Sequence, residues 1–323
     1  MPHKLIRMHR VHDDQAPVRQ PIMIGIAGDS AAGKTTLTKG LAEALGPDRV
    51  TTICVDDYHR YDRIERRSKP FTALHPDCNH VEIIEQHLQL LATGQPILKP
   101  VYDHSTGELT RPVLVRPKEF VIVEGLLPLH TRLMRACFDV TAYLDPPEEI
   151  RRQWKVCRDT SRRGYNADQV LAELVDREPE SAAYIRPQRA FADVVVRFAP
   201  VAGRDDPPGT PLSAELMLRP TIRHPDLSGS LAERDQRAIH LRLCRDEDGQ
   251  PADVLHIHGY VPREESRIVE KVLWAQLGVD AGFPAETLGD IGNGERSEPL
   301  AITQLLLLYH LLAARGIRDA RDG

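Results

Sequence analysis

Short, continuously apolar runs alternate with amphipathic stretches over the first two thirds of the chain. Helical patterns of apolar positions fall between most of these runs. Continuous apolar strands separated by helices are typical of a mostly parallel sheet that helices cover on both faces. The strand-like runs lie at 22–27, 50–55, 120–123, 138–144 and 193–198, and the helical patterns at 34–45, 80–93, 147–163 and 167–178.

The pattern changes after residue 200. The stretch 200–211 is rich in proline and glycine, a composition that marks a boundary. Beyond it, strand patterns follow one another without intervening helices, and two helices come last. These strands are expected at 213–218, 238–243 and 253–258, and the helices at 264–276 and 300–314. We therefore expect three parts, namely a flexible N-terminal extension over 1–20, an α/β core over 21–200 and a C-terminal α+β region over 201–323.

Composition and charge narrow the class of protein. The 323 residues are 41% hydrophobic and 28% charged, which is ordinary for a soluble globular chain. A net charge of −5 argues against a nucleic-acid partner held by phosphate contacts. Five scattered cysteines form no C-x-x-C pair, so a reducing cytoplasm is expected.

The first twenty residues lack an apolar signal segment. The apolar stretch 305–314 is too short to span a membrane and is expected to be a buried helix or a subunit contact.

One segment matches a phosphate-binding motif in full. Residues 28–35 read G-x-x-x-x-G-K-T between the first predicted strand and the first predicted helix. Its glycines let backbone N–H groups point at phosphates, and the helix N-terminus adds partial positive charge. Lys34 is expected to reach the β- and γ-phosphates, and the Thr35 hydroxyl to ligate Mg²⁺. The sequence therefore predicts a nucleotide site formed by Gly28, Asp29, Ser30, Ala31, Ala32, Gly33, Lys34, Thr35 and Thr36.

Carboxylates follow two other predicted strands. Glu124 ends the run 120–123, where an acid in phosphate-binding α/β folds sits beside the metal. The alternative is a solvated glutamate. Asp56 and Asp57 end the run 50–55, where a kinase needs a carboxylate to accept the proton of the acceptor hydroxyl. Adjacent strand residues point to opposite faces, so one aspartate is expected to do this, and spacing leaves open which.

Cations and polar side chains downstream suggest an anionic acceptor, although each has an ordinary explanation. The loop cations match phosphate geometry or form a solvated loop; they are Arg60, Arg63, Arg66, Arg67 and Lys69. The charged arc of helix 147–163 is either its solvated face or a lid over transferring phosphates; it comprises Lys155, Arg158, Asp159, Arg162 and Arg163. Tyr102, His104 and Thr106, in a connector, are expected to recognise sugar hydroxyls or to form a turn.

Together these segments resemble the phosphoribulokinase family, in its plant and cyanobacterial branch. The matching stretches are GDSAAGKTT, TICVDDYHRYDR, KPVYDHSTG, VIVEGLLPLH, KVCRDTSRRG and YIRPQRAFADVVVRFAP, with a weaker likeness in DGQPADVLHIHGYVP. The resemblance implies a P-loop kinase core with a mostly parallel sheet flanked by helices, plus a C-terminal α+β extension. It also implies a homodimer that transfers phosphate from Mg·ATP to the 1-hydroxyl of D-ribulose 5-phosphate.

The resemblance assigns roles that spacing leaves open. Asp56 is implied to be the catalytic base, and His59, Arg63, Tyr102 and His104 to contact the sugar phosphate. Asp159, with Lys155, Arg158 and Arg163, is implied to form the lid that stabilises the transferring charge. The chain departs from plant-type members at Ala32, where they carry a cysteine that pairs with the one matching Cys54. Cys244 stands alone where they carry a pair, so neither the redox switch nor cysteine-dependent docking of an inhibitory partner is expected.

Three rival interpretations remain. A uridine kinase shares the P-loop and the strand-end aspartate, but its neutral acceptor leaves the arginines of 60–67 without a phosphate. A regulatory GTPase needs an N-K-x-D segment, and Asn79, Asn166 and Asn293 are not followed by lysine. An inactive kinase-like binding module conflicts with the retention of Lys34 and Asp56.

Overall fold

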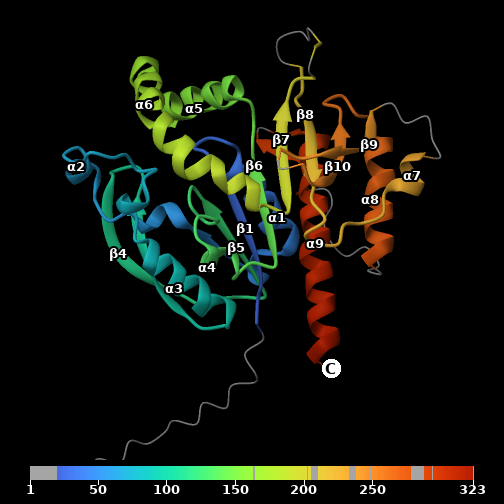
Figure 1. Ribbon diagram of the computed structural model, residues 1–323, viewed down its shortest axis with the longest axis horizontal. Coiled ribbons are helices and arrows are strands. Elements are labelled where there is room, and N and C mark those ends of the chain that lie inside the picture. Colours follow the sequence, from blue (N-terminus) through green and yellow to red (C-terminus); the bar gives the residue numbers. More distant parts are fainter. Residues whose placement is uncertain are drawn as a thin grey trace, which may run out of the picture.

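A computed structural model describes residues 20–162, 164–201, 203–204, 210–232, 238–247, 249–277, 287–292 and 294–322. One eight-stranded sheet runs through it in the order β2-β5-β1-β6-β7-β8-β10-β9 (Figure 1). Five strands are parallel, namely β1 (Ile22–Gly28), β2 (Val50–Cys54), β5 (Phe120–Gly125), β6 (Val140–Leu144) and β7 (Val194–Ala199). β1, β5 and β6 are buried along their whole length, which explains their continuous apolar runs. The predicted α/β fold with a mostly parallel sheet is confirmed.

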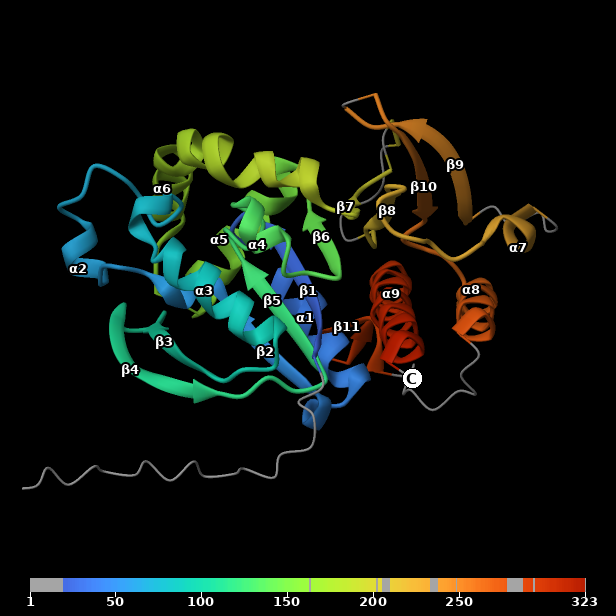
Figure 2. The same ribbon diagram turned by 60° about the horizontal axis from the view of Figure 1, so that its bottom comes forward.

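Helices cover both faces of the sheet, and alternate residues of β1 contact different helices. Ile22, Ile24 and Ile26 belong to the core beneath α1 (Lys34–Leu45) and α9 (Glu298–Asp322). Met23 faces the other side, in the core beneath α3 (Val81–Ala92) and α4 (Arg132–Arg135) (Figure 2). The remaining helices are α2 (Arg63–Arg66), α5 (Glu148–Arg162), α6 (Ala167–Glu180), α7 (Ser228–Ala232) and α8 (Arg263–Leu277), and a π-helical segment, Ser181–Ile185, follows α6.

The C-terminal strands continue the same sheet. β8 (Ser213–Leu218) pairs antiparallel with β7, and β10 (Pro251–Ile257) and β9 (Ile239–Arg245) extend the sheet outward. Leu255 and Ile257 share one hydrophobic core with β1. The predicted extension is therefore joined to the kinase-like core by hydrogen bonds and by packing, and the division at residue 200 stays a prediction. The predicted N-terminal extension lies outside the described residues except for Gln20.

The connector between α3 and β5 differs from the prediction. It is a hairpin of β3 (Ile97–Asp103) and β4 (Glu108–Val115), separate from the main sheet. Sequence patterning missed it because a proline interrupts each strand, Pro100 in β3 and Pro112 in β4, and because the apolar residues of β4 form no buried face. A second small hairpin joins β11 (Asp290–Gly292) and β12 (Glu295–Arg296).

Helix α9 is longer than its apolar stretch indicated. The predicted stretch 305–314 lies within the longer segment Glu298–Ala320, which is long and apolar enough, by length and composition, to cross a membrane. The expectation of a buried helix is confirmed, because 72% of its apolar window is buried inside the protein. Gln304 of α9 approaches the carbonyl oxygens of Thr36 and Leu37 at 3.4 Å, and a Cβ at Gly40 of α1 would lie 2.1 Å from the Gln304 amide nitrogen. The two helices therefore meet closely beside the phosphate loop.

Candidate active site

The candidate site lies at the carboxyl edge of the parallel strands. β1 ends at Gly28, β2 at Cys54 and β5 at Gly125, and Cys54 stands opposite Glu124 in the strand register. A 3₁₀ turn, Val55–Tyr58, follows β2 and carries Asp56 and Asp57. The predicted phosphate loop and the predicted acids are therefore brought to one edge, as expected for the carboxyl ends of parallel strands.

The phosphate loop has the backbone that its motif predicts. Gly33, immediately before α1, has a φ of 95°, a conformation that suits glycine. Ala31 adopts a φ of 65°, which is unusual for a residue with a side chain. The Lys34 ammonium donates hydrogen bonds to the carbonyl oxygens of Gly28 at 2.8 Å and Asp29 at 2.9 Å, so the lysine folds over its own loop. This cradle fits a phosphate chain. Thr35 and Thr36 follow on the exposed side of α1.

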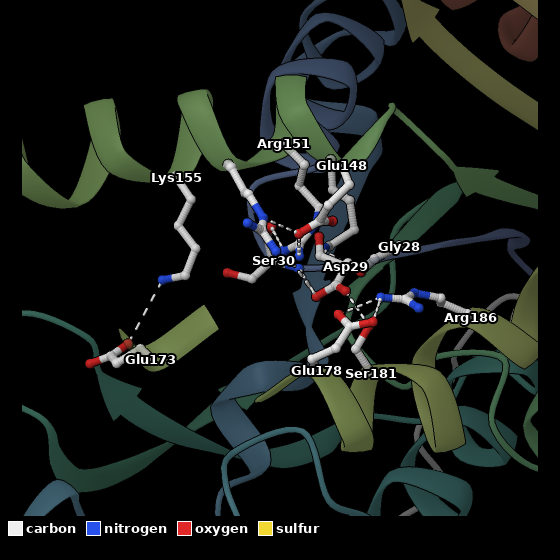
Figure 3. Close-up of polar contacts among 12 residues, drawn as sticks. Gly28, Asp29, Ser30, Glu148, Arg151, Lys155, Glu173, Glu178, Ser181 and Arg186 are labelled. Carbon is white, nitrogen blue, oxygen red and sulfur yellow. Dashed lines mark hydrogen bonds and ion pairs between the residues drawn. The ribbon is translucent and has the colours of Figure 1, made fainter. Parts of the chain in front are cut away.

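Helices α5 and α6 close over this loop through contacts that sequence reasoning missed (Figure 3). Arg151 of α5 donates to the Ser30 carbonyl oxygen at 3.2 Å and pairs with Glu148 through two contacts of 2.8 Å. The Ser181 hydroxyl, on the π-helical segment, donates to the Asp29 carboxylate. Pro179 lies inside α6 just before this segment and removes a backbone donor there. The predicted helix ended at residue 178, and the proline that directly follows it was a sequence signal of this irregularity.

Asp56 and Asp57 have different partners. The Asp56 carboxylate accepts a hydrogen bond from the Leu126 backbone nitrogen at 2.9 Å. Gly125, with a φ of 152°, allows this approach, because a Cβ there would lie 2.8 Å from the Asp56 carboxylate oxygen. Asp57 instead forms an ion pair with Lys99 of β3, and both side chains are largely buried. The Asp57 carboxylate is thus paired with a residue of the hairpin, while Asp56 lies between β2 and β5.

Glu124 is buried at this edge, and its environment suits a cation. Burial raises the pKa of the Glu124 carboxyl, the Lys34 charge acts to lower it, and Asp56 and Asp57 raise it further. These influences show that all four groups share one electrostatic environment. Burial, followed by the charges of Asp56 and Glu124, also raises the pKa of the Cys54 thiol well above its usual range. A buried acid beside other acids is the kind of donor that binds Mg²⁺.

Three of the predicted acceptor residues cluster. The ring of His59 lies edge-on to the rings of Tyr102 at 4.7 Å and of His104 at 6.4 Å, and Tyr102 and His104 are 5.0 Å apart. His59 is buried and shares a 2.8 Å hydrogen bond with Asn79. Burial lowers the pKa of His59 to about 4, although the Asp56 charge opposes this. The hairpin that patterning missed therefore supplies two rings beside the aspartate turn.

The arginines of the segment 60–67 differ in the contacts that they make. Arg63 donates to the carbonyl oxygen of His104 at 2.8 Å, which ties α2 to the hairpin tip. Arg60 bonds to Glu82 and to the Asn79 backbone, so its charge is matched locally. Arg66 reaches the Tyr102 hydroxyl at 3.4 Å, and its Nη1 is buried without a hydrogen-bond partner among the described residues. Sequence reasoning left Arg66 undecided, and its position beside the ring cluster makes it a candidate anion ligand.

The charged arc of α5 is not a solvated face. Lys155 and Asp159 are buried, with their charged atoms 2.6 Å apart, and Arg158 pairs with Asp159 at 2.8 Å. Hydrogen bonds from Arg158 and Lys155 outweigh burial and hold the pKa of Asp159 below its ordinary value. Arg158 also reaches the Ser30 hydroxyl at 3.3 Å, so this arc faces the phosphate loop. Arg163 lies outside the described residues, as does the side chain of Arg162.

The fold and the cradle define a P-loop nucleotide-binding protein, and comparisons with known proteins narrow the class. Residues 23–203 match the model of the Phosphoribulokinase / Uridine kinase family. The chain belongs to this family.

The chain is similar both to phosphoribulokinases and to uridine kinases. The chain is 38% identical to a phosphoribulokinase from Synechocystis sp. over 202 residues, 62% of this chain and 61% of that protein. It is 31% identical to a uridine kinase from Brevibacillus brevis over 180 residues, 54% of this chain and 84% of that protein. The match to the Synechocystis relative thus spans less than two thirds of that protein. A phosphoribulokinase structure from Rhodobacter spheroides shares the fold, with a TM-score of 0.57, 15% identity and coverage of 80% of this chain and 97% of that one.

Proposed function

We propose that this protein is a phosphoribulokinase, which transfers the γ-phosphoryl group of ATP to the 1-hydroxyl of D-ribulose 5-phosphate and forms D-ribulose 1,5-bisphosphate. The observation that supports this best is the cluster of Asp56, His59, Tyr102 and Arg66 beside the phosphate loop. At one edge of the sheet, this cluster combines a carboxylate, two polar aromatic rings that can contact sugar hydroxyls, and a cation.

The nucleotide side of the reaction is assigned to the phosphate loop. Backbone N–H groups of residues 28–36 would hold the phosphates, and the Lys34 ammonium would leave its carbonyl partners for them. Thr35 and Glu124 would hold Mg²⁺, which would neutralise charge on the phosphates. The burial of Glu124 among other acids fits this role, because a cation would offset their repulsion.

Asp56 is assigned the role of general base. Its carboxylate is anchored by one backbone hydrogen bond from Leu126, which leaves the second oxygen for the acceptor hydroxyl. It would accept the hydroxyl proton as the bond to phosphorus forms. His59, Tyr102 and His104 would contact sugar hydroxyls. Arg63 and Arg66 would bind the 5-phosphate, whose oxygens could accept from the Arg66 Nη1 that has no hydrogen-bond partner among the described residues.

The charged arc of α5 is assigned to the transferring phosphoryl group. Arg158 contacts both the phosphate loop and Asp159, so Asp159 would orient it rather than react. Lys155 and Arg163 complete this proposed set, which would stabilise negative charge as it develops. We further propose a cytoplasmic homodimer without nucleic-acid or membrane partners, as the family resemblance and net charge suggest.

The test compares acceptors side by side. ATP consumption is measured with ribulose 5-phosphate, uridine and pantothenate at equal concentrations. We expect ribulose 5-phosphate to give the fastest ADP release. Arg66→Ala should raise the KM for ribulose 5-phosphate and leave the KM for a neutral acceptor unchanged. The Brevibacillus relative makes uridine kinase the second candidate, and faster turnover of uridine would establish that alternative.

A further inference from the structure

Three histidines gather on the outer strands of the sheet, away from the phosphate loop. His240 lies on β9, His256 on β10, and His258 directly after β10. β10 is four strands away from β1 in the sheet order, and Figure 1 shows these strands on the opposite side of the molecule from α5 and α6. The cluster therefore has no part in the proposed kinase reaction.

Strand pairing places the three rings on one face. His256 stands directly opposite His240 in the antiparallel register, and His258 follows two residues later, on the same side. Leu255 and Ile257 point into the core beneath α8 and α9, so the histidines occupy the other face. His240 is exposed, and the other two are half-buried. Solvent ions can therefore reach the cluster.

The ring geometry suits a metal ion. One nitrogen from each of the three rings lies within 4.8 Å of the other two, and His256 Nδ1 is 3.1 Å from His240 Nε2. Zinc binds histidine nitrogen at about 2.0–2.1 Å, so two nitrogens on one tetrahedral ion are roughly 3.3 Å apart. The His240–His256 pair already has nearly this separation. Small side-chain rotations of His258 would complete a three-nitrogen set.

Neighbouring charges favour a cation only in part. Glu215 of β8 stands opposite His256 in the register, on the same face, and supplies a carboxylate beside the rings. Arg242 lies 3.6 Å from Glu215 and offsets some of this charge. Neutral imidazole is a ligand for zinc, copper and nickel, whereas Mg²⁺ prefers oxygen. The donor set therefore selects a different metal from the phosphate site.

We propose that His240, His256 and His258 form a binding site for a divalent transition-metal ion, with water in the fourth position. The ion would link β9 to the end of β10 and so brace the outer edge of the sheet. Three protein ligands and one exchangeable position describe an accessible site rather than a fully enclosed one.

The experiment titrates the full-length protein with Zn²⁺ against a chromophoric chelator and records the visible spectrum with Co²⁺. We expect one Zn²⁺ per chain at this site and a Co²⁺ spectrum typical of tetrahedral coordination. His240→Gln and His256→Gln should each weaken Zn²⁺ binding at least about tenfold, because each removes a direct ligand. Two variants keep the test decisive if one fails to fold, and circular dichroism checks each.

The N-terminal His3, His9 and His12 provide the matched control. Replacing all three with glutamine should leave the proposed site at its wild-type affinity. Loss of the bound Zn²⁺ in this control, or unchanged affinity in both His240→Gln and His256→Gln, would overturn the proposal. Zn²⁺ should also raise the melting temperature of the wild type more than that of His240→Gln.

Discussion

Replacing each of the two consecutive aspartates with asparagine should separate catalysis from stability. Asp57→Asn removes the carboxylate partner of Lys99, whose side chain is only 10% exposed. The ammonium then has only neutral acceptors among the described residues, namely the new amide oxygen and the Pro100 carbonyl oxygen at 3.2 Å, so its buried charge is no longer compensated. Breaking a buried ion pair costs about 3–5 kcal/mol, and the 16% exposure of Asp57 favours the lower end, about 3 kcal/mol. The melting temperature should fall by roughly 5 °C.

Asp56→Asn should do the reverse. The amide oxygen of asparagine can still accept the hydrogen bond from the Leu126 nitrogen, so the free energy of unfolding should change by less than about 1 kcal/mol. Asparagine cannot take a proton from the acceptor, so kcat should fall by about 10²–10⁴, with smaller effects on either KM. Both variants should be assayed for ADP release with ribulose 5-phosphate and for thermal unfolding.

A double-mutant cycle with Lys99→Met supplies the control. If the ion pair causes the loss of stability, Asp57→Asn combined with Lys99→Met should cost less than the sum of the single changes. A larger loss of kcat in Asp57→Asn than in Asp56→Asn would show that Asp56 is not the base. Equal changes in unfolding free energy in the two variants would show that the Asp57–Lys99 ion pair does not stabilise the fold.

Three further predictions concern the acceptor, the lid and the thiols. Arg63→Ala should mainly raise the KM for ribulose 5-phosphate, because a lost phosphate contact weakens ground and transition states alike; an unchanged KM would remove Arg63 from the acceptor site. Arg158→Ala should mainly lower kcat in the same assay, since Arg158 reaches the phosphate loop, and an effect confined to KM would contradict its assignment to transferring charge. Incubation with oxidised dithiothreitol should leave activity unchanged, because Ala32 offers Cys54 no partner in the loop, and the raised pKa of Cys54 should also make its alkylation slow. Reversible inactivation would show that another cysteine reaches Cys54.

Local patterning was enough for the parallel core but not for the contacts that complete the site. β1 and α1 could be predicted because buried apolar runs, glycines and helical periodicity all act over short stretches of chain. The β3–β4 hairpin could not, because β4 is exposed and its pairing depends on the neighbouring strand rather than on its own composition. The hairpin in turn supplies Lys99, so the different environments of Asp56 and Asp57 could not be predicted from hydrophobic periodicity either.

Helix α5 shows why amphipathic patterns can mislead at a functional edge. A charged arc ordinarily faces water, yet here Lys155 and Asp159 are buried and satisfy each other. Cys157 on the same helix is exposed, although it is less polar than either. Only the arrangement of α6 and the phosphate loop around this helix determines which face is covered, and no spacing within α5 encodes that.

The close contact between α9 and α1 has a consequence for how the chain is made. Gln304 follows Thr36 by 268 positions, so the helix that begins at the phosphate loop is synthesised long before the helix that covers it. At about 5–20 residues per second, translation leaves Leu37 and Leu41 without this cover for more than about ten seconds. A nascent chain with an exposed apolar helix is a substrate for chaperones, and nucleotide binding should be acquired only near the end of synthesis.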